Sequence, residues 1–225
     1  MSVLRLEGAR PLDDDVSPLE APMTLALEPG DLCLVRAADQ GMARALTELC
    51  AGIPPLAEGR VVLLGEDMTT LPRRRAEPLR ARIGIAPGED GWLPHLPVED
   101  SLLLARRHHG ETDGAALRAE AEALCRHFGL DGIPAVSPHE LSRLDLARVG
   151  CARAFLGKPD LLLLESPLDA EAADTLVEPL RRRLDGVLGR GAAALWTTRS
   201  HRAWEDPSFG ATQRFELHRR GLVPA

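Results

Sequence analysis

Tyrosine is absent from this sequence, and aromatic residues make up only 3% of its 225 residues. A hydrophobic core therefore has to be built mostly from leucine, valine and alanine, and the 44% hydrophobic content supplies enough of them. The chain also has no excess of positive charge: 27 Lys and Arg face 34 Asp and Glu, so the formal net charge is −7. This charge argues against a nucleic-acid partner, because binding to a phosphate backbone requires concentrated Lys and Arg. The basic clusters at 73–75 and 181–183 are short, and we interpret them as solvated faces.

Closely spaced cysteines are missing too. The four cysteines lie far apart in apolar stretches, and no C-x-x-C pair occurs, so a zinc site built on them is not expected. We expect buried free thiols in a reducing compartment at Cys33, Cys50, Cys125 and Cys151. The adjacent His108 and His109 are a possible metal pair, but we interpret them as a polar pair at a helix end.

No apolar run is long enough to cross a membrane. The longest leucine run, Leu161 to Leu164, is far shorter than the roughly 20 residues of a membrane span. Acidic residues at 13–15 and Glu20 interrupt the N-terminal segment, so no signal peptide is expected. These features predict a soluble protein that associates with a membrane only through a partner.

Hydrophobic patterns predict alternating strands and helices at both ends of the chain. Strands are predicted at 3–6, 24–27, 32–35, 60–65, 82–85, 161–164 and 192–197, with a closing hairpin at 214–217 and 221–223. Helices are predicted at 42–50, 98–108, 115–128, 142–156 and 170–188. An all-helical segment from about 98 to 150 separates the two alternating regions. The chain length and this pattern indicate one domain, an α/β core with a helical insertion.

Several motifs occur in an order that is typical of one protein family. The motif G-x-x-P-x-x-x-G-R-V occupies 52–61, and the apolar segment at 94–103 contains Pro94 and Leu102. The strongest match runs from Glu140-Leu141-Ser142 through a Pro-containing turn to the leucine strand and Pro167. In order and spacing these motifs resemble the ATP-binding subunit of an ABC transporter over roughly residues 3–223.

This resemblance implies a P-loop NTPase fold of the ABC cassette type. Residues 1–225 would form a single cassette with a RecA-like core, an N-terminal β-subdomain and an inserted helical subdomain at 89–150. It also implies ATP and Mg²⁺ as cofactors, and an integral-membrane permease as a partner of the helical subdomain. The cassette would form a homodimer or a heterodimer with another cassette at the cytoplasmic face of the inner membrane. The compact size is similar to that of cassettes from lipid-transport systems of the Mla or mammalian-cell-entry type.

The phosphate loop departs from the family pattern. A P-loop, G-x-x-x-x-G-K-[ST], wraps phosphate with backbone N–H groups, neutralises it with Lys and holds Mg²⁺ with a hydroxyl. Here Arg36 replaces the first glycine, whereas Gly41 is kept. Met42 stands at the lysine position and Ala43 at the hydroxyl position. Asp39 adds a carboxylate where an anionic phosphate would lie.

Other positions of the composite site are altered as well. Arg44 lies two positions beyond the lysine position, and a helix points such a residue elsewhere. Gly88 stands at the Q-loop glutamine, Glu165 at the metal-binding aspartate and Ser166 at the general base. A serine is not a carboxylate base, although Glu165 retains an oxygen ligand for a cation. No aromatic residue for stacking on adenine stands near 8–16.

The signature motif and the switch are changed in the same way. The family's LSGGQ reads L-S-R-L-D here, so Ser142 is kept and Arg143 obstructs the close backbone approach that glycine permits. The D-loop is shortened to Leu168-Asp169. Arg199 stands at the switch histidine. We interpret His201, two residues later, as a surface histidine rather than a displaced switch.

We therefore expect a cassette that does not hydrolyse ATP and serves as a structural or regulatory subunit on a permease. Loss of one electrostatic donor commonly costs roughly 10²- to 10³-fold in rate, and here several are lost together. One alternative is an active ATPase, with Glu165 as metal ligand and Arg36 or Arg44 on phosphate. Another is a cassette fold reused for regulation without any transporter.

Overall fold

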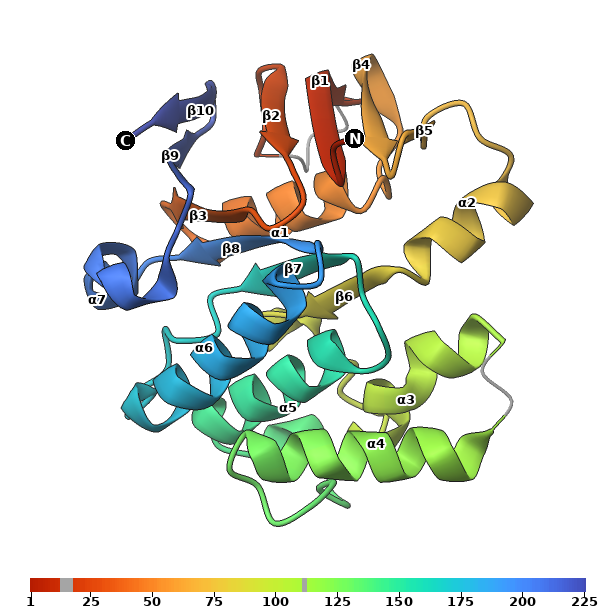
Figure 1. Cartoon of the computed structure of the whole chain (residues 1–225), viewed down its shortest axis with the longest axis vertical. Helices are drawn as coiled ribbons and strands as arrows, with labels where there is room; N and C mark the ends of the chain where they lie inside the picture. Colours follow the sequence, from red (N-terminus) through yellow and green to blue (C-terminus); the bar gives the residue numbers. More distant parts are fainter. Residues whose placement is uncertain (13–17, 111–112) are drawn as a thin grey trace.

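The computed structural model describes residues 1–12, 18–110 and 113–225. Two β-sheets lie next to each other, and helices cover the larger one (Figure 1). The smaller sheet has the strand order β2-β1-β4-β5 and the larger one β10-β9-β3-β8-β7-β6. The acidic residues at 13–15, and part of the segment considered for adenine stacking, lie outside the described residues.

The smaller sheet is antiparallel and has one buried face. Its strands are β1 (Leu4–Pro11), β2 (Met23–Leu27), β4 (Leu56–Leu63) and β5 (Glu66–Asp67). Burial alternates along β2, as expected for a sheet with one face on the core. Gly59 has a positive φ of 75°, and a Cβ there would lie 2.0 Å from the carbonyl oxygen of Gly8. Only glycine permits this close crossing of β1 and β4.

The larger sheet is parallel except for its edge strand. Its strands are β3 (Leu32–Ala37), β6 (Ile83–Ala86), β7 (Leu161–Glu165), β8 (Ala193–Thr198), β9 (Gln213–His218) and the antiparallel β10 (Gly221–Pro224). Leu161 and Leu163 pack into the core shared with the smaller sheet, whereas Leu162 and Leu164 pack into the helical core on the other face. Burial on both faces explains why β7 is a continuous leucine run.

Helices cover both faces of the larger sheet. They are α1 (Gln40–Cys50), α2 (Arg73–Arg80), α3 (Val98–His108), α4 (Gly114–His127), α5 (Arg143–Phe155), α6 (Asp174–Leu188) and α7 (His201–Glu205). In the described residues, 3-10 turns lie in the connections from β6 to α3 (η1, Glu89–Gly91), from α4 to α5 (η2, Pro138–Glu140) and from α7 to β9 (η3, Pro207–Phe209). Helix α1 packs on the face toward the smaller sheet. On the other face α5 packs against β6 and β7, and α3 and α4 pack against α5 (Figure 1).

Most predicted elements are confirmed, including α3 with its predicted bounds and the β9–β10 hairpin. Helix α2 was missed, because only Ala76 is buried on it and Pro78 interrupts its sequence. Helix α6 begins at Asp174 instead of Ala170, since the preceding residues turn through Ala172, which has a φ of 59°. The subdomain boundaries at 89–150 stay a prediction.

Side chains outside the site largely follow the predictions. All four cysteines are free and buried. Residues 73–75 are exposed on α2, and on α6 both Arg181 and Arg182 pair with Glu178. Within the described residues, no helix is both long and apolar enough to cross a membrane.

Candidate functional site

A crevice opens at the carboxyl ends of the parallel strands, where open α/β sheets bind their ligands. The N-terminus of α1, the segment after β6, the segment after β7 and the start of α5 surround it. Its residues include seven with polar side chains, Gln40, Glu89, Arg143, Glu165, Ser166, Asp169 and Arg199. The solvent-accessible volume is about 40 Å³, room for a few water molecules.

Asp39 closes the anion-binding end of α1. It has an extended backbone conformation, with φ −147° and ψ 173°, and its carboxylate oxygen Oδ1 accepts a hydrogen bond from the Met42 N–H at 2.8 Å. A Cβ at Gly41 would lie 3.2 Å from the same oxygen. The first free N–H groups of a helix attract anions, and an aspartate cap satisfies one of them. The protein's own carboxylate thus binds one of the N–H groups that would otherwise attract a phosphate and places a negative charge beside the others.

The residues at the lysine and hydroxyl positions belong to the core. Met42 is 4% exposed and Ala43 is 1% exposed, and both pack into the cluster between α1 and the smaller sheet. A methionine thioether and an alanine methyl carry no charge and offer no hard oxygen ligand. The two side chains therefore offer no positive charge to a phosphate and no hydroxyl to a metal ion.

The two nearby arginines are engaged with acidic partners. Nε of Arg44 donates to Oε1 of Glu48, one turn along α1, at 2.9 Å. Arg36 pairs with Glu216 on β9, and its guanidinium carbon lies 5.1 Å from the ring centre of Trp204. These i,i+4, ion-pair and cation–π contacts engage the positive charges of both arginines with groups of their own chain.

Glu165 bridges β7 and the segment after β6. Its Oε2 accepts a hydrogen bond from the Gly88 N–H at 3.0 Å, and the residue is 7% exposed. Burial raises the pKa of this carboxyl, against the lowering effect of the Gly88 hydrogen bond and of the Arg44 charge. At least one carboxylate oxygen of Glu165 is therefore already hydrogen-bonded to the protein backbone.

Gln40 is a residue of the site that the sequence reasoning missed. A Cβ at Gly88 would lie 2.4 Å from Nε2 of Gln40. The Gln40 side chain thus reaches from the phosphate loop to the Q-loop position and fills the space beside Gly88. Its location next to Gly41 was visible in the sequence, but the Q-loop contact depends on β6 and β3 lying in one sheet.

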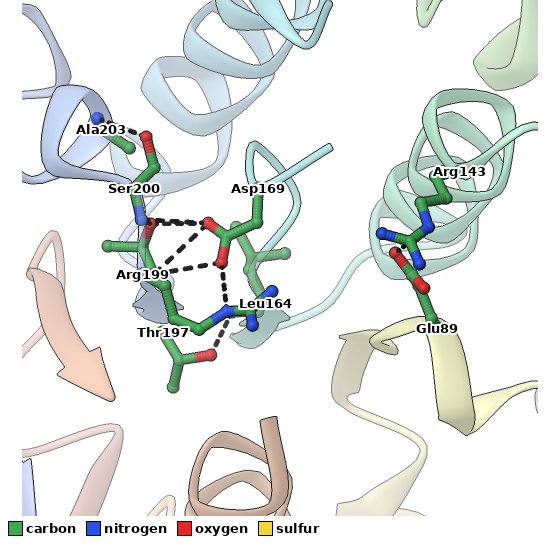
Figure 2. Close-up of polar contacts among 9 residues, drawn as sticks. Glu89, Arg143, Leu164, Asp169, Thr197, Arg199, Ser200 and Ala203 are labelled. Carbon is green, nitrogen blue, oxygen red and sulfur yellow. Dashed lines mark hydrogen bonds and ion pairs between the residues drawn. The ribbon is translucent and has the colours of Figure 1, made fainter. Parts of the chain in front are cut away.

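Asp169 organises the switch region (Figure 2). Its side chain is 8% exposed and accepts hydrogen bonds from the Thr198 hydroxyl at 3.0 Å and from the backbone N–H groups of Arg199 and Ser200. Nε of Arg199 also donates to Oδ2 of Asp169 at 3.0 Å. The residue at the switch position is therefore held by the D-loop of its own chain. Sequence reasoning named Asp169 only as part of a shortened loop.

Ser166 follows β7, and His201 is the first residue of α7. Ser166 has a φ of 50°, and its buried Oγ makes no hydrogen bond within the described part of the chain. His201 is exposed on α7 and lies 3.2 Å from Oε1 of Glu205, one turn along the same helix. The structure therefore places His201 at the surface, as interpreted from the sequence.

The signature residues contact their own chain. Oγ of Ser142 accepts from the Asp145 N–H at 3.0 Å and so caps α5. The side chain of Arg143 is 76% exposed, and its Nε lies 3.3 Å from Oε1 of Glu89 (Figure 2). This ion pair links the start of α5 to the segment after Gly88. As an exposed pair it contributes at most about 1 kcal/mol.

Solved structures define the fold class. The dimeric structure of MJ0796, a bacterial ABC transporter cassette, aligns with a TM-score of 0.81 at 16% sequence identity, covering 97% of this chain and 96% of that one. A post-hydrolysis form of the same cassette, bound to ADP and Pi, aligns with a TM-score of 0.78 at 17% identity and the same coverage. The predicted P-loop NTPase fold of the ABC cassette type is thereby confirmed.

Sequence comparison then identifies the family. A family profile described as ABC transporter matches residues 44–169, more than half of the chain. The chain belongs to the ABC transporter family, as a cassette of the ATP-binding type.

Curated relatives include both import and export proteins. The phosphonates import ATP-binding protein PhnC of Alcaligenes faecalis is 30% identical over 77% of this chain and 65% of its own length. The Nod factor export ATP-binding protein I of Burkholderia pseudomallei is 31% identical over 78% and 56%. A Salmonella choleraesuis protein with the provisional name 2-aminoethylphosphonate import ATP-binding protein PhnT is 30% identical over 72% and 43%. The chain thus spans less than two thirds of the length of each of these relatives.

Proposed function

We propose that this chain is a degenerate cassette that docks a membrane permease as a structural or regulatory subunit and does not hydrolyse ATP. The observation that carries the proposal is the Asp39 cap on α1. At the helix end where the family binds phosphate, the Met42 N–H already has an anionic acceptor at 2.8 Å. A bound triphosphate would have to displace this carboxylate and would meet its negative charge.

The donor set does not fit MgATP. A phosphate site needs a positive side chain and free N–H groups, and a Mg²⁺ site needs oxygen ligands in octahedral geometry. Met42 and Ala43 supply neither charge nor oxygen, and an oxygen of Glu165 is bound to the Gly88 N–H. We therefore derive no hydrolytic step for this chain. The family match supports the same view, because it begins at Arg44, beyond the phosphate loop.

Pairing with an intact cassette would not restore ordinary turnover. In the family each composite site joins the phosphate loop of one cassette to the signature motif of the other. This chain carries Asp39 in the first and the paired Arg143 in the second. Either a homodimer or a mixed dimer would have an altered half in every site that it forms.

The permease would dock in an apolar groove between the larger sheet and the helical segment. The groove has a volume of about 170 Å³ and lies between β6, the end of α1 and α3. Ile53, at its rim, is 56% exposed, while Ile83, Ile85 and Leu102 line it. The occupant that we propose is a short helix of a permease, because the curated relatives carry the names of import and export ATP-binding proteins. The protein would then lie at the cytoplasmic face of the inner membrane.

The lipid-transport branch stays a prediction. Size alone suggested a lipid-transport branch, and the relatives named above are phosphonate importers and a Nod factor exporter, which lend that branch no support.

Calorimetric titration of the purified chain with MgATP tests the first half of the proposal. We expect no binding at millimolar nucleotide and no phosphate release above the buffer blank. An ABC cassette with an intact phosphate loop serves as positive control under the same conditions. Micromolar, Mg²⁺-dependent ATP binding would overturn the proposal in favour of an ATPase with unusual motifs.

Membrane co-purification tests the second half. Replacement of Ile53 by Asp places a charge in the groove, and we expect this variant to be lost from the membrane fraction. Val223, 50% exposed on β10, supplies the matched control, and Val223→Asp should stay with the membrane. If neither the wild type nor the control recovers a permease, the chain is a regulatory protein without a transporter.

A further inference from the structure

A cluster of metal-binding side chains lies outside the crevice. Glu77 comes from α2, His108 is the last residue of α3, and His109 is its C-cap. Both helices lie on the same side of the molecule (Figure 1). Oε2 of Glu77 lies 3.5 Å from Nε2 of His108 and 3.8 Å from Nδ1 of His109. The helix-end position predicted for the two histidines is confirmed, but their rings converge on one carboxylate oxygen from another element.

The spacing of these three atoms suits a transition-metal ion. Zinc binds nitrogen and oxygen ligands at 2.0–2.2 Å in tetrahedral geometry, so two donors on one ion are about 3.4 Å apart. All three ligand atoms here lie within 4.8 Å of one another. Shifts of a few tenths of an ångström would bring both histidine nitrogens to the required separation from the carboxylate oxygen.

The second oxygen of Glu77 is held by neighbouring arginines. Nε of Arg73 lies 3.2 Å from Oε1, and Nη1 of Arg80 lies 4.0 Å from it. The Arg73 hydrogen bond can orient the carboxylate as a metal ligand, as outer partners do in known metal sites, and the Arg80 ion pair adds attraction on the same oxygen. They leave Oε2 directed at the two histidines. The same arginines add positive charge near the ion, so we expect micromolar rather than nanomolar affinity.

We propose that Glu77, His108 and His109 bind one divalent transition ion, with Zn²⁺ as the best fit, and thereby link the end of α3 to α2. Two imidazoles and a carboxylate favour Zn²⁺, Ni²⁺ or Cu²⁺ over Mg²⁺ and Ca²⁺, which prefer all-oxygen sites. Three protein ligands leave a fourth position for water or for a donor from a partner.

The site has a consequence for the docking groove. His109 and Arg80 both line the groove described above. An ion that links α2 to α3 would therefore fix one wall of the groove at the rim where His109 lies. The proposal concerns the chain itself and does not depend on ATP or on the presence of a permease.

Titration of the chelator-treated full chain with Zn²⁺ by isothermal calorimetry tests the site. We expect one ion per chain, with affinity at least tenfold weaker in His108→Gln, His109→Gln and Glu77→Gln. Substitution of Co²⁺ should give the intense visible absorption of a tetrahedral site. Mg²⁺ at the same concentration should give no heat.

His95→Gln is the matched control, because His95 is also exposed and lies in the segment before α3. This variant should bind zinc as the wild type does. Circular dichroism of each variant without metal checks folding, and His108→Gln is the decisive variant because that side chain is 60% exposed. The proposal is wrong if the wild type binds no zinc, or if the three ligand variants bind it as tightly as the wild type.

Discussion

Replacement of Asp39 by alanine is the sharpest test of the reasoning about the phosphate loop. The change removes the acceptor of the Met42 N–H, a bond of 2.8 Å at the start of α1. Loss of an aspartate N-cap costs about 1 kcal/mol, within a range of about 0.5–2. For a chain of 225 residues, 1 kcal/mol lowers the melting temperature by about 2–4 °C. Scanning calorimetry resolves a shift of this size.

The same substitution should create an anion site. With the carboxylate gone, the free N–H groups and the helix dipole at the start of α1 are available to phosphate or sulfate. An anion present at ten times its dissociation constant stabilises a protein by about 1.4 kcal/mol. We therefore expect phosphate to raise the melting temperature of Asp39→Ala more than that of the wild type.

Asp39→Asn separates the charge from the cap. Asparagine caps a helix about as well as aspartate. This variant should melt within a degree or two of the wild type, and phosphate should not stabilise it further. The reasoning fails if Asp39→Ala is as stable as the wild type, or if phosphate stabilises both to the same extent.

Three further predictions concern the crevice and the sheet that supports it. Burial raises the pKa of Glu165 in the folded state above its ordinary value. Its contribution to folding stability is therefore fully present below the ordinary glutamate pKa and is lost as the pH rises through the raised value. Glu165→Gln, which can still accept from the Gly88 N–H, should therefore unfold at higher urea than the wild type at pH 7, with a difference that shrinks toward pH 4; a constant difference would contradict the burial argument. Asp169→Ala removes the acceptor of the Arg199 N–H and one of the two acceptors of the Ser200 N–H, and urea titration should show a loss of about 1–3 kcal/mol; an unchanged midpoint would mean that the network is not stabilising. Gly84→Ala puts a Cβ 1.9 Å from the Ala154 carbonyl oxygen, so thermal melting should show a loss of folding stability of about 1–3 kcal/mol or more. The control is Gly132→Ala, whose Cβ would have no atom within 4 Å, and it should melt as the wild type does.

The fold was largely predictable because its strongest signals are local. Continuous burial on both faces makes β7 a run of leucines, and α3 begins after Pro97 with acidic residues in its first turn. Helix α2 lacked such a signal, because it buries only Ala76 and lies on the surface. The helix has only eight residues, contains Pro78 and begins without a side-chain cap, so the usual start and stop signals of a helix are missing.

The site was predictable as a set of absences but not as a set of contacts. The sequence predicts that Met42 and Ala43 lack the required groups, and that Asp39 brings a carboxylate to the loop. It does not predict that Asp39 caps α1 or that Glu165 reaches the Gly88 N–H. The latter contact joins residues 77 positions apart, and it exists only because β6 and β7 are neighbours in the sheet.

At each helix start beside the crevice, one N–H group has a side-chain acceptor of its own chain, Asp39 on α1 and Ser142 on α5. On the proposed function, this subunit joins its partners without nucleotide. The lifetime of its complexes would then be set by the dissociation rate of the protein surfaces alone. The fraction of permease bound would depend on the abundance of the two partners and not on the ATP supply of the cell.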